Sequence, residues 1–68
     1  MNVQDVEARV KAIEAVLDDP EGAHIDEDEL HSNVLYYIST ADIPRKDMRL
    51  LAQAALKTHA LDMTRWYA

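Results

Sequence analysis

Residues 3–17 read VQDVEARVKAIEAVL, and apolar side chains recur in this stretch every three or four residues. This spacing places them on one face of an α-helix, with charged residues such as Glu7 and Lys11 on the other. Asn2 is suited to cap the helix, because its side chain can accept from the backbone of the first turn. We therefore predict a helix over residues 3–18, which Pro20 and Gly22 end. Its predicted core residues are Val3, Val6, Val10, Ile13 and Leu17.

A second helix is predicted over residues 26–40 from the signals at its start. Asp26 is the expected N-cap and Glu29 the acid of a capping box, while Ile25 and Leu30 are spaced for a hydrophobic staple. The helix is expected to stop near Thr40. Its predicted core residues are Leu30, Val34, Leu35, Ile38 and Ala41, with Tyr37 at the margin.

A third helix is predicted over residues 44–59, since Pro44 suits a first helical turn and apolar residues again recur at helical spacing. Asp62 is placed to cap a short C-terminal turn at 63–67, in which Trp66 covers the core. The predicted core face of the third helix comprises Met48, Leu51, Ala52, Ala55, Leu56 and His59.

The composition agrees with a single helical domain over residues 1–68. The chain has one Gly, two Pro, no Phe and 49% hydrophobic residues, which favours folded helices over disorder. A core of this size rarely supplies more than about 3–5 kcal/mol, and the lack of Cys excludes disulfides and thiolate zinc sites. We predict an all-α three-helix bundle stabilised by close packing or by association of copies.

Charge is distributed unevenly along the chain. Residues 18–29, the expected connection between the first two helices, hold seven of the thirteen acids and no Lys or Arg, while the net charge of the chain is −6. Acids at a helix start can be purely structural, because they interact favourably with the helix dipole. Alternatively, the stretch presents negative charge to a basic partner or mimics a phosphate backbone. The acids are Asp18, Asp19, Glu21, Asp26, Glu27, Asp28 and Glu29.

Metal binding is the third interpretation of this stretch. His24, Asp26, Asp28 and His31 offer ligands within eight residues, but they match neither the HExxH spacing nor an EF-hand loop. We therefore predict no metal site and no cofactor. Catalysis is not expected either, because a single Gly excludes a phosphate-binding loop and no hydroxyl lies in a nucleophile motif.

The C-terminal half carries the opposite charge. Arg45, Lys46 and Arg49 open the third helix and would suit DNA in a helix-turn-helix, yet the overall negative charge opposes approach to phosphate. Nucleic acid is therefore not the expected partner. The same bases can meet the acids of a second copy, which makes a homo-oligomer an open alternative. Of the adjacent Tyr36 and Tyr37 only one can face inward, so Tyr36 is a candidate contact residue.

Three segments resemble small uncharacterised proteins encoded by phages of actinobacteria. They are EDELH at 27–31, AQAALKT at 52–58 and LDMTRWYA at 61–68. The likeness covers the last 45 residues or so and is carried by common helical residue types. The resemblance implies an intracellular accessory protein expressed in the host, and it carries no catalytic residues over to this chain.

These features together predict a small acidic, non-enzymatic binding protein that docks on a basic protein surface, as a phage accessory factor would on a host protein. The alternative is a structural or self-associating module whose acids only cap a helix and keep the protein soluble. Since the chain has neither an apolar run of membrane-spanning length nor a signal-like N-terminus, we expect it in the cytoplasm and not in a membrane.

Overall fold

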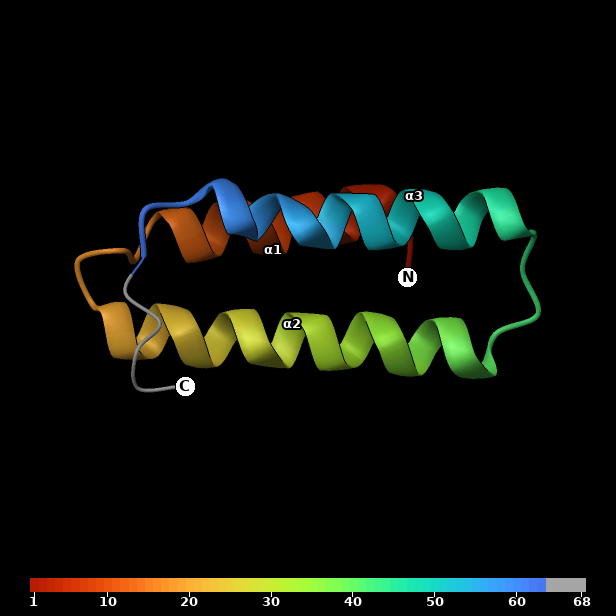
Figure 1. Cartoon of the computed structure of the whole chain (residues 1–68), viewed down its shortest axis with the longest axis horizontal. Helices are drawn as coiled ribbons and strands as arrows, with labels where there is room; N and C mark the ends of the chain where they lie inside the picture. The colour runs from red at the N-terminus through yellow and green to blue at the C-terminus, as the bar shows by residue number, and fades with distance from the viewer. Residues whose placement is uncertain (64–68) are drawn as a thin grey trace.

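A computed structural model describes residues 1–63 and shows three helices packed side by side. They are α1 (Val3–Glu14), α2 (Pro20–Thr40) and α3 (Arg45–Leu56), and a 3₁₀ turn, η1 (Lys57–Ala60), continues α3. Helix α2 runs antiparallel to the other two, and α1 lies behind α3 in the view of Figure 1. The prediction of an all-α three-helix bundle is confirmed. The bundle measures 36 × 19 × 15 Å along its principal axes.

Helix α1 forms for the reasons that its sequence indicates. Asn2 caps it, with the Asn2 side chain accepting from the Asp5 amide at 2.8 Å and the Asp5 carboxylate accepting from the Asn2 amide at 2.9 Å. Val6 and Ile13 are buried against the other helices. The helix ends at Glu14, four residues before the predicted end, and residues 15–18 form turns.

Helix α2 begins at Pro20, so the predicted start at Asp26 is wrong. Asp19 is the N-cap, its side chain accepting from the Gly22 amide at 3.3 Å, and Pro20 occupies the first turn. Proline is favoured there because its fixed φ suits a helix and its missing N–H would have no helical partner. Residues 20–29 are therefore helical and not a connection, and Asp26 lies inside the helix.

The earlier start of α2 extends its buried face toward the N-terminus. Ala23, Glu27, Leu30 and Val34 form the buried stripe, at the spacing of one helix face. The predicted staple residue Ile25 is 56% exposed, and Leu35, predicted to be in the core, is 68% exposed. Ile25 lies inside the helix because α2 starts at residue 20, and Leu35 follows Val34 by about 100° around the helix, which places it outside the stripe.

Helix α3 follows the prediction more closely. It starts after Pro44, whose carbonyl accepts from the amides of Asp47 and Met48 at 3.0 and 3.1 Å. Leu51, Ala54 and Ala55 are buried, but Leu56 is 53% exposed, which contradicts its predicted core position. His59, also predicted on the core face, is exposed. The predicted turn at 63–67 and the Trp66 lid fall on residues 64–67, outside the described part of the chain.

The shared core lies between the three helices. It is built mainly from aliphatic side chains of each, and Met63 closes it beyond η1. None of the helices within residues 1–63 combines the length and the apolar character that crossing a membrane requires. The buried hydrophobic residues are Val6, Ile13, Ala23, Leu30, Val34, Leu51, Ala54, Ala55 and Met63.

Candidate functional site

The seven acids of residues 18–29 do not share one environment. Six are exposed, on the turn before α2 and on the first half of that helix, whereas Glu27 is only 3% exposed. We call the six exposed residues the acidic surface: Asp18, Asp19, Glu21, Asp26, Asp28 and Glu29. Because most of them lie on a helix and not on a loop, the structure holds them at fixed positions.

The acidic surface spreads over both flanks of α2. On the α1 side, Asp26 and Glu29 line a shallow hollow with the half-buried Arg9. When the Asn33 amide is oriented with its oxygen toward Arg9, that oxygen accepts from the guanidinium at 3.0 and 3.3 Å. Sequence reasoning missed Arg9 here, since only the packing of α1 on α2 brings it beside the acids.

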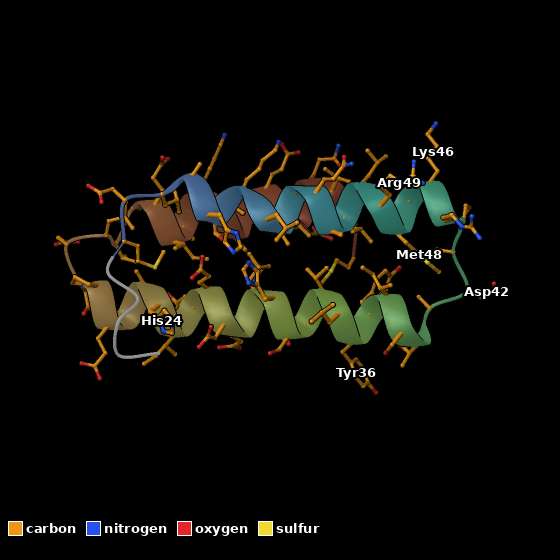
Figure 2. The ribbon with its side chains drawn as sticks, viewed as in Figure 1. His24, Tyr36, Asp42, Lys46, Met48 and Arg49 are labelled. Carbon is orange, nitrogen blue, oxygen red and sulfur yellow. The ribbon has the colours of Figure 1, made fainter. Side chains whose placement is uncertain are left out.

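The other flank carries Asp28, which pairs with a histidine. Nδ1 of His24 lies 3.6 Å from a carboxylate oxygen of Asp28, one helical turn away. His24 is 6% exposed, and Figure 2 shows it in the first part of α2. No Lys or Arg within residues 1–63 forms an ion pair with the acidic surface.

The basic residues at the start of α3 lie at the opposite end of the bundle. Figure 2 shows Lys46 and Arg49 there, pointing away from α2. The bundle therefore has an acidic end and a basic end, separated along its long axis. Tyr36 is 73% exposed and points outward from α2, which agrees with its choice as the outward tyrosine, and Tyr37 packs against the core.

An apolar groove runs between α2 and α3. Its walls are aliphatic except for His31 at one end, and no residue of α1 lines it. Leu35 and Leu56 both line this groove. They are the most exposed of the leucines that we predicted to be in the core. The six apolar residues of this α2–α3 groove are Val34, Leu35, Ile38, Ala52, Ala55 and Leu56.

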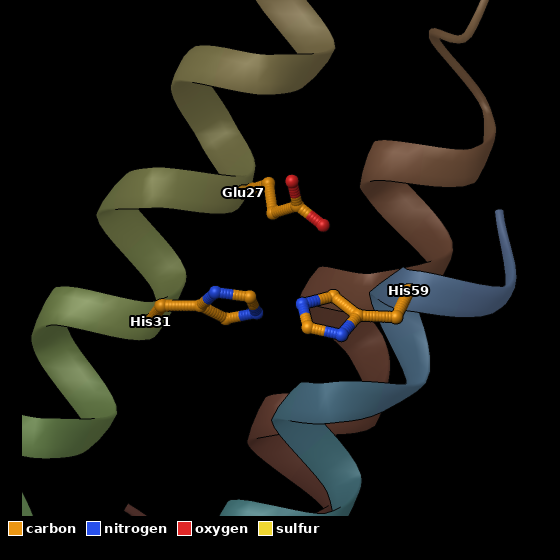
Figure 3. Close-up of side chains that lie close together, drawn as sticks. All are labelled: Glu27, His31 and His59. Atoms are coloured by element: carbon orange, nitrogen blue, oxygen red, sulfur yellow. The ribbon is translucent and has the colours of Figure 1, made fainter. Parts of the chain in front are cut away.

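A cluster of ligand-type side chains lies near the same end of the groove. Glu27 and His31, one turn apart on α2, face His59 of η1, as Figure 3 shows. One ligand atom from each residue lies within 4.8 Å of the other two. The two imidazole rings meet edge to face, with centroids 5.6 Å apart and planes at 70°.

Hydrogen bonds hold the His31 ring in this position. Its Nε2 lies 3.1 Å from the carbonyl oxygen of Ala55 and 3.0 Å from Oγ1 of Thr58. The Thr58 hydroxyl donates to the same Ala55 carbonyl at 3.2 Å, so its oxygen is left to accept. Both neighbours of Nε2 are therefore acceptors, which places a proton on Nε2.

The structure does not assemble the ligand set that we weighed from the sequence. His24 faces Asp28, while His31 turns toward α3 and η1. The grouping of Glu27 with His59 had no sequence signal, because 32 residues separate them. The placement of η1 beside His31 brings them together.

Comparisons with protein-family models, with curated proteins and with solved structures find no match to this chain.

Proposed function

We propose that the chain is a non-enzymatic binding module that docks on a basic protein surface through its acidic surface. The observation that supports this most strongly is that six carboxylates lie exposed on a preformed helix and its N-terminal turn. Charges held in place before binding lose less conformational entropy on association, and a field of one sign steers a basic partner at long range.

The two flanks of α2 are not equivalent in this proposal. Arg9 lies beside Asp26 and Glu29 in the hollow, whereas no Lys or Arg within residues 1–63 pairs with Glu21 or Asp28. The flank of α2 that carries Glu21 and Asp28 is therefore the more negative of the two and the better docking face. The resemblance to actinobacterial phage proteins adds the hypothesis that the partner belongs to a bacterial host, and that hypothesis stays a prediction.

The test is a titration with a fluorescent decalysine peptide in low and moderate salt. We expect the double variant Glu21→Gln/Asp28→Asn to bind more weakly than the unchanged chain, with the difference shrinking as salt screens the charges. The matched control is Asp42→Asn/Asp47→Asn, which removes the same charge at the other end of the bundle.

The control distinguishes binding through the acidic surface from binding that depends only on the net charge of the chain. If both double variants lose affinity equally, only total charge matters and the docking proposal is wrong. Circular dichroism on each variant shows whether the helices persist, because Glu21 also interacts favourably with the N-terminus of α2.

A second candidate function is self-association through the α2–α3 groove. Leu35 and Leu56 are 68% and 53% exposed at its rim, so the groove presents apolar side chains to solvent. Two copies packed antiparallel on this face would bring the acidic end of each near the basic end of the other. Charge would then set the geometry while apolar burial stabilises the dimer.

Sedimentation equilibrium at two salt concentrations tests this candidate. We expect Leu35→Glu to yield monomers, because it places a charge in the apolar groove. Tyr36→Glu is the matched control: it adds the same charge one residue further on, at a position that points away from the bundle. If the unchanged chain is monomeric at about 100 μM, a concentration at which weak dimers already form, the dimer is ruled out.

A further inference from the structure

We propose that Glu27, His31 and His59 form a binding site for a divalent transition-metal ion of the zinc type. This inference goes beyond the proposed function and does not depend on it. The three residues offer one carboxylate oxygen and two imidazole nitrogens, which is a donor set that suits Zn²⁺ and related ions far better than Ca²⁺ or Mg²⁺.

The distances between the donors require only a small adjustment. Ligand atoms around a tetrahedral zinc ion with bonds of ~2.0–2.2 Å are about 3.3 Å apart. The donors here lie within 4.8 Å of one another, so they must approach by about 1.5 Å at most. His59 can make this movement, because it is exposed and stands on a short 3₁₀ turn.

The surroundings of His31 match those of a metal-ligating histidine. Such residues usually donate one ring N–H to a carbonyl or hydroxyl, which fixes the ring and leaves the other nitrogen for the ion. Nε2 of His31 makes this contact with Ala55 and Thr58. This contact leaves the lone pair of His31 on Nδ1.

The position of Glu27 also suits a cation. Its carboxylate is 3% exposed and lies on the side of α2 that faces the two imidazole rings. A metal ion held there would connect α2 and η1, two elements that are distant in the sequence. Three protein ligands leave a fourth tetrahedral position for water or for a group of a partner.

The test is calorimetric titration of the full chain with Zn²⁺ in chelator-treated buffer. We expect one equivalent to bind, and the variants Glu27→Gln and His59→Gln each to lower the affinity by roughly tenfold or more. His59→Gln is the decisive variant, because an exposed residue can be replaced without loss of the fold. His31 is left unchanged, since its hydrogen bonds also join α2 to α3 and η1.

His24→Gln is the matched control. It removes the other α2 histidine, which faces Asp28 and lies outside the cluster, so zinc affinity should not change. Co²⁺ supplies a second readout, because its visible absorption reports tetrahedral coordination and should disappear in His59→Gln. The proposal is overturned if the chain does not bind zinc, if His59→Gln binds as tightly as the unchanged chain, or if His24→Gln loses binding.

Discussion

One face of α2 buries a carboxylate, while positions beside and opposite that face expose aliphatic side chains. Glu27 is 3% exposed between Ala23 and Leu30, whereas Ile25 and Leu35 are 56% and 68% exposed on the same helix. If hydrophobicity alone decided burial, Ile25 and Leu35 would be buried and Glu27 would be exposed. The position of each residue around the helix decides its burial, because α1 and α3 cover only the stripe that repeats at helical spacing from residue 23.

The largest effect should come from breaking the buried face. Leu30→Ala should lower the free energy of unfolding by about 2–5 kcal/mol, since the residue is fully buried and its removal leaves a cavity. Leu35→Ala should change it by less than about 0.5 kcal/mol, as is usual for surface sites. Urea unfolding followed by circular dichroism measures both. Equal losses would contradict the assignment of the two faces.

An intermediate effect should distinguish the two possible starts of α2. Asp19→Ala should cost about 1 kcal/mol, because it removes the side chain that caps the Gly22 amide. Asp26→Ala should cost less than about 0.5 kcal/mol, since Asp26 lies on the exposed side within the helix. The reverse order in urea unfolding would contradict the start at Pro20 and favour a start at residue 26.

The smallest effect is expected on the exposed face itself. Asp28→Asn removes the charge that lies 3.6 Å from His24, but the Asp28 side chain is 68% exposed and solvent screens the pair. We expect a loss of about 0–0.5 kcal/mol that disappears in high salt. Thermal unfolding at two ionic strengths checks this. A loss that persists in high salt would show that Asp28 contributes by packing.

The sequence predicted α1 and α3 well because their local and tertiary signals agree. The spacing of Val6 and Ile13 and the capping by Asn2 all indicate the same helix, and the structure confirms them. For α2 the signals conflict. The capping-box and staple pattern at Asp26 and Ile25 is a valid local pattern, but Pro20 opens a longer helix that includes it.

The candidate sites were predictable only in part. The exposed acids could be identified from their charge alone, and Tyr36 from its adjacency to Tyr37. The burial of Glu27 was missed because the sequence pattern placed the helix start six residues too late and treated Glu27 as part of an exposed first turn. The approach of His59 to His31 depends on how η1 packs against α2, which no local pattern encodes.

The carboxylate in the core stripe of α2 has a consequence for how the helices align. The neighbouring stripe positions hold Ala23, Leu30 and Val34, which are apolar and would fit against aliphatic side chains in more than one alignment of the helices. Glu27 would not, since sliding α2 by one turn would place its carboxyl group against aliphatic side chains. Single polar core residues specify register in coiled coils in this way, at some cost in stability. We expect Glu27 to favour one alignment of α2 with α1 and α3 over alignments shifted by a turn.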